Sequence, residues 1–319
     1  MIPIPINDGA DEEERELRMG LADAATDPPP PKRGAAETSI EWTHRPRIDG
    51  SLMPGFTFNL WWGCEPAPAA EGSGDKQSPA CDHCYAAAYA SFRGHAGCWP
   101  DTARGGGGDR LGGLRRFLSD DNWNGPRKWN AAASKLGEQH AVFCGSMMDI
   151  GDDRADLEPH RQRFWRLVDD TPNLIWLLLT KRPENLRRMV PWRGRWPGHV
   201  AFGVTVEAPE YLTRCEEALR ADATLHFVSH EPALRETDFA PVIGSKRGRV
   251  RWGIIGSESG ARARVVPVDR AERFVAAFKK AGAAPYVKQL DAALLGLGRR
   301  GKAIKDIEKL PAHLRVRDW

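Results

Sequence analysis

Short apolar runs rich in β-branched and aromatic residues recur along the chain, and polar stretches with a helical period separate them. Apolar runs of this kind predict strands buried on both faces, and their alternation with helices predicts a parallel sheet. The predicted strands are residues 57–62, 141–144, 174–179, 200–206, 225–229, 251–256 and 285–288. The predicted helices are residues 160–169, 183–190, 209–220 and 269–281.

This pattern predicts an α/β protein built on a parallel β/α barrel, complete or partial, and an open doubly wound sheet is the alternative. We expect a single barrel domain over residues 38–319, with a C-terminal extension from about residue 290. Residues 1–37 are acidic and proline-rich without a sustained apolar period, so they are predicted to be a disordered tail. Residues 65–80 and 101–113 are rich in Gly, Pro and small polar residues and are predicted to be flexible.

The charge of the chain is unevenly distributed. The first 30 residues contain eight acidic and two basic residues, a net charge of −6, which leaves +9 on the rest because the whole chain carries +3. A moderately basic body tolerates a polyanionic partner, although an ordinary solvated surface explains the charge equally well. The chain has no apolar run of 18 residues and no secretory signal pattern, so we expect a cytoplasmic protein with no membrane partner.

Polar and ionisable side chains follow nearly every predicted strand. Because the carboxyl ends of parallel strands meet at one rim, we expect a ligand-binding or catalytic site there. Strand ends without a function would be expected to carry Gly, Asn, Asp and Pro, whereas this chain has a succession of charged residues. The residues that follow the predicted strands, and are therefore expected at this rim, are Gly145, Ser146, Asp149, Lys181, Arg182, Glu207, His230, Glu231, Ser257, Glu258 and Lys288.

Three cysteines lie close together in the sequence, Cys64 after the first predicted strand and the C-x-x-C pair Cys81 and Cys84 at the start of a helix-like stretch. Six cysteines are too few for a disulfide scaffold, and C-x-x-C in a reducing compartment indicates a metal or redox site. The start of a helix favours negative charge, and three thiolates on a [4Fe–4S] cluster leave the fourth iron open for S-adenosylmethionine. The segment between Cys64 and Cys81, residues 65–80, is long. We expect it to loop outward, since each doubling of loop length costs only about 0.6 kcal/mol of closure free energy.

A zinc site is the alternative interpretation of the same three thiols. A fourth protein ligand would close a tetrahedral structural site, and the chain would then be a zinc-stabilised nucleic-acid-binding or interaction module without catalysis. His83, His95 and Cys98 are the candidate fourth ligands. A barrel that has lost its cofactor is a third interpretation. Cys144 and Cys215 are predicted to be buried, with no assigned function.

Nine short motifs resemble, in order, a conserved phage-associated family whose members carry a three-cysteine motif and are described as radical-SAM-like. These motifs are TSIEWT (38–43), WWGC (61–64), CDHCYA (81–86), GSMMD (145–149), WLLLTKRPEN (176–185), GVTVE (203–207), EP (231–232), IIGSESG (254–260) and KQ (288–289). The resemblance implies a radical-SAM-type barrel, a [4Fe–4S] cluster on Cys64, Cys81 and Cys84, and S-adenosylmethionine as cofactor. It also implies an electron donor such as flavodoxin or ferredoxin. A looser similarity to spore photoproduct lyase, a radical enzyme of DNA repair, makes nucleic acid one candidate substrate.

The resemblance assigns roles to residues on the rim. Gly145, Ser146 and Asp149 stand where radical-SAM proteins meet the methionine amino group, and a helix cap is the alternative role of Asp149. Thr205 and Glu207 are suited to ribose hydroxyls. The glycine-rich segment 253–260, which includes Gly256, Ser257 and Glu258, would let the backbone approach a flat base.

The reaction implied is reductive cleavage of S-adenosylmethionine to a 5′-deoxyadenosyl radical that removes a hydrogen atom from the substrate. His230 and Glu231 are the acid–base candidates, since histidine titrates near neutrality, and Lys181 could meet a carboxylate or phosphate. The chain contains 12 tryptophans, several of them near the predicted site in the sequence. Stacking of bases on these rings would fit a nucleic-acid substrate, although core packing is the commoner role of tryptophan.

Overall fold

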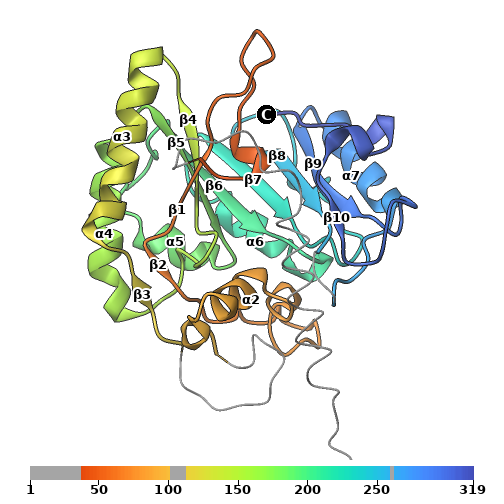
Figure 1. The fold of residues 1–319 in the computed structure, drawn as a ribbon, viewed down its shortest axis with the longest axis horizontal. Helices are drawn as coiled ribbons and strands as arrows, with labels where there is room; N and C mark the ends of the chain where they lie inside the picture. Colours follow the sequence, from red (N-terminus) through yellow and green to blue (C-terminus); the bar gives the residue numbers. More distant parts are fainter. Residues whose placement is uncertain (1–36, 101–112, 259–261) are drawn as a thin grey trace, which may run out of the picture.

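The computed structural model of the protein describes residues 37–100, 113–258 and 262–319, and its main feature is a curled sheet of eight strands (Figure 1). The strand order is β1-β4-β5-β6-β7-β8-β9-β10; the first seven are parallel and β10 runs antiparallel to β9. The strands are β1 (Phe56–Phe58), β4 (His140–Cys144), β5 (Leu174–Thr180), β6 (Val200–Thr205), β7 (Leu225–His230), β8 (Val250–Gly256), β9 (Ala284–Asp291) and β10 (Ala303–Ile304). The predicted tail up to residue 36 and residues 101–112 lie outside the described residues.

The strands follow one another around the sheet in sequence order. A doubly wound sheet reverses direction at a central strand, and this sheet does not. The two edge strands, β1 and β10, are not hydrogen-bonded to each other. The fold is therefore a partial β/α barrel, which confirms the predicted fold class in its incomplete form.

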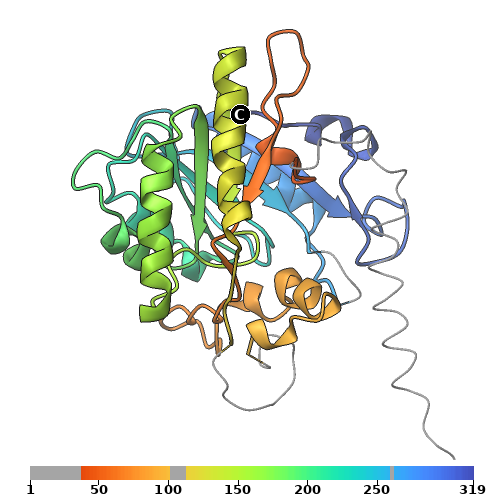
Figure 2. The same cartoon turned by 60° about the vertical axis from the view of Figure 1, so that its left-hand side comes forward.

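Five helices pack along the outer, convex face of the sheet (Figures 1 and 2). They are α3 (Asp120–Leu136), α4 (Glu158–Asp169), α5 (Pro183–Met189), α6 (Thr213–Ala218) and α7 (Val268–Lys280). Alternate side chains of each strand face these helices, and those of Val142, Trp176 and Phe202 are fully buried there. This burial on both faces of the strands explains why the apolar runs in the sequence are nearly continuous.

The concave face of the sheet packs around one tryptophan. Trp42, in the 3-10 helix η1 (Glu41–Thr43), lies with its ring centroid 4.6 Å from that of Phe143 and 5.9 Å from that of Trp252. The indole N–H of Trp319 donates to the Trp42 carbonyl at 2.7 Å. These contacts fill the interior of the half-barrel and form the floor beneath the rim.

Two features of the chain differ from the sequence prediction. The first predicted strand is divided into β1 and β2 (Trp61–Trp62), and β2 pairs with β3 (Arg116–Phe117) in a separate two-stranded ribbon. Helix α3 was not predicted, because Pro126 interrupts its sequence, yet the proline lies inside the helix. Within the described ranges, none of the helices combines the length and hydropathy needed to cross a bilayer.

Candidate functional site

The carboxyl ends of the parallel strands open into a cavity of about 330 Å³. Helix α2 (Tyr85–Phe92) lies across these strand ends (Figure 1). On the inner side the cavity reaches Trp42, which forms part of its wall. A volume of this order is typical of a pocket for a small molecule or cofactor.

Three of the six cysteines line this cavity, and all six are free thiols. Cys64 stands two residues after β2, Cys81 ends the short 3-10 helix η2 (Pro79–Cys81), and Cys84 is the N-cap residue of α2. The C-x-x-C pair therefore precedes the helix instead of forming its first turn. The rim brings together the three thiols that the sequence analysis singled out.

Burial determines the protonation of Cys64 and Cys84. It raises the pKa of Cys64, although the nearby Arg182 guanidinium opposes the shift. Burial likewise raises the pKa of Cys84, although the backbone N–H groups of Ala87 and Ala86 at the start of α2 act to lower it. Both thiols therefore hold their protons at neutral pH until a metal ion displaces them.

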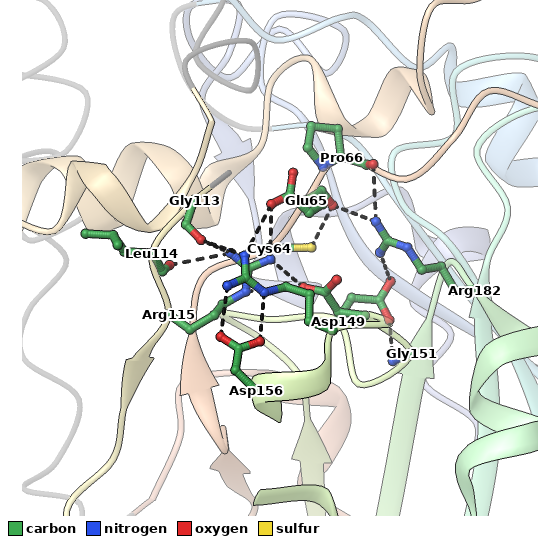
Figure 3. Close-up of polar contacts among 12 residues, drawn as sticks. Cys64, Glu65, Pro66, Gly113, Leu114, Arg115, Asp149, Gly151, Asp156 and Arg182 are labelled. Carbon is green, nitrogen blue, oxygen red and sulfur yellow. Dashed lines mark hydrogen bonds and ion pairs between the residues drawn. The ribbon is translucent and has the colours of Figure 1, made fainter. Parts of the chain in front are cut away.

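Arg182 fixes the backbone that carries Cys64 (Figure 3). Its Nη2 donates to the carbonyl oxygens of Glu65 at 2.8 Å and Pro66 at 3.2 Å. The Cys64 Sγ donates to the same Glu65 carbonyl at 3.0 Å. One guanidinium thus holds the first cysteine and the start of the following segment against the rim.

Asp149 holds this arginine in place. Its Oδ2 accepts from Arg182 Nη1 and from the Lys181 backbone N–H, each at 3.0 Å. Its Oδ1 accepts from Thr180 Oγ1 at 2.5 Å and from the Gly151 N–H at 2.9 Å. Burial by itself would raise the pKa of Asp149, but Arg182 and these donors outweigh burial and lower it. The residue is therefore an anion with both oxygens engaged, in an Asx-type turn and not at a helix cap.

Lys181 places a positive charge beside the C-x-x-C thiols. Desolvation lowers the pKa of its ammonium, but Cys81, Glu207, Asp149 and Cys84 more than compensate, so the pKa is raised and the group is charged. Among the described residues its ammonium takes part in no hydrogen bond or ion pair. The cavity consequently presents an unneutralised cation next to two thiols.

The segment between Cys64 and Cys81 does not loop outward as expected. The Ser78 side chain is fully buried and hydrogen-bonds to the Glu207 carboxylate. Arg264 Nη2 donates to the Pro79 carbonyl at 2.6 Å, and the Ala67 N–H lies 3.4 Å from the Cys81 sulfur. These partners lie on distant strands and loops, so the Pro- and Gly-rich composition of the segment gave no sign of them.

Two further polar groups form the opposite wall of the cavity. Glu231 pairs with Lys288 at 3.0 Å. Glu258 accepts from the Arg264 backbone N–H at 2.7 Å and lies 3.3 Å from His83 Nδ1. Arg264 and its neighbouring donors lower the pKa of Glu258, although burial opposes this. The Glu258–His83 contact ties the C-x-x-C turn to the end of β8.

Most of the site residues predicted from the sequence line this cavity. Those that do are Cys64, Cys81, Cys84, Gly145, Ser146, Asp149, Lys181, Thr205, Glu231, Ser257 and Glu258. His230, Glu207 and Gly256 do not.

His230 faces the outer layer of the barrel. Its Nδ1 lies 2.5 Å from the Val206 carbonyl, and its ring is stacked against Phe274 with centroids 5.9 Å apart. Burial lowers the pKa of His230 to about 4, so the imidazole is neutral near pH 7. The structure therefore corrects the expectation that His230 is an acid–base residue of the cavity.

The buried His230 should make stability depend on pH. Between pH 6.5 and about 4 the unfolded chain binds a proton at this residue and the folded protein does not, so stability falls as the pH is lowered. We expect His230→Asn to reduce the loss of unfolding free energy between about pH 7 and about pH 4.5 by roughly 2–3 kcal/mol. Urea unfolding at the two pH values measures this difference. An equal loss in wild type and variant would contradict the assignment.

Glu207 and Gly256 also have roles other than the predicted ones. The Glu207 carboxylate is fully buried and bonds to Ser78 and to Arg214 Nη1, the latter at 2.8 Å, so no oxygen is left for a ribose. A Cβ at Gly256 would lie 2.6 Å from Glu231 Oε1. The glycine thus makes room for a protein side chain and not for a cofactor base.

Of the three candidate fourth ligands of the alternative zinc site, His83 lines the cavity with the three thiols, and His95 and Cys98 do not. Cys98 packs outside the cavity near the Arg116 backbone, His95 lies edge-on to Trp62, and His83 contacts Glu258. In the described part of the chain no three His, Cys, Asp or Glu side chains meet closely enough to hold one metal ion.

Sequence reasoning missed a second buried ion pair that supports the Cys64 segment. Arg115 Nη2 lies 2.5 Å from Asp152 Oδ2 and 3.5 Å from Glu65 Oε1. Arg115 immediately precedes the ribbon strand β3, and Figure 3 shows it on the side of Cys64 opposite Arg182. Asp152 stands three residues after Asp149 in the same post-strand segment, which is the one signal that could have indicated it.

The fold and site together define a partial parallel β/α barrel with three free thiols in a cavity at its rim. The chain belongs to the family described as "Protein of unknown function (DUF5131)", which matches residues 37–305. This match covers every motif of the resemblance found in the sequence.

No curated protein matches the chain significantly. Among solved structures, "Spore photoproduct lyase complexed with dinucleoside spore photoproduct" aligns with 86% of this chain and 93% of its own, at 9% identity and a TM-score of 0.38. A similarity of this degree establishes neither shared substrate nor shared chemistry.

Proposed function

We propose that this chain is an enzyme of the radical S-adenosylmethionine type, in which Cys64, Cys81 and Cys84 hold a [4Fe–4S] cluster. The proposal rests on one observation: of the six free cysteines, these three line the cavity, whereas Cys98, Cys144 and Cys215 do not. Three thiolate ligands leave one iron open for a small ligand, which a closed structural metal site does not.

The charges around the cavity fit this donor set. A cluster with three thiolate ligands is anionic, and the free ammonium of Lys181 lies beside Cys81 and Cys84. Arg182 lies beside Cys64 and forms an ion pair with Asp149. Both cations favour thiolates over protonated thiols, which metal binding requires.

The remaining cavity residues are proposed to bind the cofactor and the substrate. When bound, the cluster and S-adenosylmethionine would supply hydrogen-abstraction chemistry through a 5′-deoxyadenosyl radical, with the electron coming from a donor such as flavodoxin or ferredoxin. We assign the binding of S-adenosylmethionine to Gly145, Ser146, Thr205 and Ser257, all of which face the cavity. Glu258 also faces the cavity, but both its oxygens are engaged by Arg264 and Oε2 also contacts His83, so it holds the C-x-x-C turn.

Asp149 and Glu231 take different roles in this scheme. Both oxygens of Asp149 are engaged by Thr180, Arg182 and backbone N–H groups, so it positions the rim and does not contact the methionine ammonium. Glu231, paired with Lys288, faces the cavity and is placed to accept a proton from a substrate.

Anaerobic reconstitution of the full chain with iron and sulfide tests the proposal. We expect a brown protein with about four irons and four sulfides per chain, and formation of 5′-deoxyadenosine on reduction with S-adenosylmethionine present. Cys98→Ala is the control and should retain the cluster. A colourless protein with one zinc per chain that is lost in Cys98→Ala would establish the zinc module instead. Binding of neither metal would indicate a barrel without a cofactor.

A further inference from the structure

Helix α2 has its large and small side chains on the opposite faces from those of an ordinary surface helix. Its buried face consists of alanines, with Ala86, Ala87 and Ala90 at most 5% exposed. Three aromatic residues point outward instead: Tyr85 is 59% exposed, Tyr89 39% and Phe92 61%. Their spacing of four and three residues places these aromatic side chains on one face of the helix. Aromatic groups gathered on a solvent-exposed surface indicate a partner.

The aromatic surface continues onto the neighbouring ribbon and is flanked by cations. The ring of Trp62 lies 6.0 Å from that of Tyr89, and the Arg116 guanidinium lies 5.4 Å from the Trp62 ring centre. Arg93 follows Phe92 directly and is exposed. Neither guanidinium forms an ion pair with any residue in the described ranges. We call this surface, comprising Tyr85, Tyr89, Phe92, Trp62, Arg93 and Arg116, the α2 aromatic face.

The α2 aromatic face is continuous with the cavity. Tyr85 belongs to both, because its ring is exposed on α2 while the residue lines the cavity beside Cys84. Its hydroxyl donates to the Ser146 carbonyl at 2.7 Å, which fixes the ring at the mouth. A polymer lying along α2 would therefore reach the mouth of the cavity at Tyr85.

We propose that the α2 aromatic face binds single-stranded nucleic acid by base stacking and leads a nucleotide to the cavity. Exposed rings offer stacking surfaces to every base, and free guanidinium groups pair with the phosphate backbone and stack on bases and rings. Nucleic acid is then also the substrate class of the proposed reaction. This assignment of the substrate rests on the proposed function, whereas the binding of nucleic acid to the α2 aromatic face does not.

Fluorescence anisotropy with a labelled oligothymidine of about 12 nucleotides tests the binding, using the full chain before and after reconstitution with iron and sulfide. We expect Tyr89→Ala and Phe92→Ala each to weaken binding on the order of tenfold. Arg93→Ala and Arg116→Ala should each lower the slope of log K against log salt by about 0.7. Leu136→Ala removes an equally exposed apolar side chain (61%) at the far end of α3 and should change nothing.

Three results would overturn the proposal. An abasic deoxyribose-phosphate oligomer of the same length that binds as tightly would show that the rings do not stack on bases. Oligothymidine binding that Tyr89→Ala and Phe92→Ala leave unchanged would assign the face to another partner, such as a protein. A chain that binds oligothymidine but takes up no iron would refute the proposed function alone, and a chain with a cluster but no oligothymidine binding would refute only this inference.

Discussion

Replacing Cys81 by alanine should abolish cluster assembly, while replacing Cys144 by alanine should leave it intact. Cys81 lines the cavity with Cys64 and Cys84, and its loss removes one of three iron ligands. Mutation of an outer-sphere partner of a metal typically costs 10- to 100-fold in affinity, so the loss of a direct ligand should exceed about 100-fold. Cys144 is fully buried at the end of β4 among the side chains that face the helices.

The measurement is iron and sulfide per chain after anaerobic reconstitution and desalting, together with the electron paramagnetic resonance signal of the reduced protein. Cys215→Ala, in α6, is a second matched control because this residue is also fully buried and outside the cavity. Thermal melting of each variant separates loss of the cluster from loss of the fold. Equal iron loss in Cys81→Ala and Cys144→Ala, with both variants folded, would refute the ligand assignment.

Replacing Asp149 by alanine should destabilise the fold by about 3–5 kcal/mol. Asp149 is 6% exposed and Arg182 is 7% exposed, so the substitution leaves a guanidinium buried without its anion. The pair also holds the carbonyl groups of Glu65 and Pro66, and we expect the Cys64 segment to become mobile. Urea unfolding measures the free energy, and hydrogen exchange over residues 64–67 measures the local effect.

Asp170→Ala is the matched control for this substitution. Asp170 also pairs with an arginine, Arg127, at 2.8 Å, but both side chains are about half exposed, so its removal should cost less than about 1 kcal/mol. A double variant, Asp149→Ala with Arg182→Met, should recover part of the lost stability because no unpaired charge remains. Equal destabilisation by Asp149→Ala and Asp170→Ala would show that the buried pair does not brace the rim.

The strands of the barrel were predictable because burial on both faces leaves a local signal. The predicted runs 174–179, 200–206 and 225–229 coincide with β5, β6 and β7 to within a residue at each end. Helix α3 was not recognised, since a proline after the first turn of a helix normally marks its end and Pro126 is instead accommodated inside. The pattern also could not divide residues 57–62 into a sheet strand and a ribbon strand, because this division depends on the partner strand β3.

The same burial conceals which side chains face the cavity. In β7, Phe227 packs on the concave face, so Ser229 and Glu231, two and four residues later, reach the cavity while His230 points outward. A strand that is polar on one face would reveal this alternation, but every residue from His226 to His230 is buried. The sequence therefore indicated chemically suitable residues at this strand end without distinguishing inward from outward ones.

The sequence by itself determined that the chain alternates parallel strands with helices and that three thiols lie close together along the chain after its first strand, since both depend on local composition and spacing. Only the tertiary structure decided that Arg182, paired with Asp149, binds the Cys64 segment, that Ser78 bonds to Glu207, and that the aromatic residues of α2 face outward. These arrangements depend on segments that the order and curvature of the sheet bring together. The physical reason is that the contacts of a side chain depend on which strands become neighbours in the sheet, and the local pattern of apolar and polar residues does not specify those neighbours.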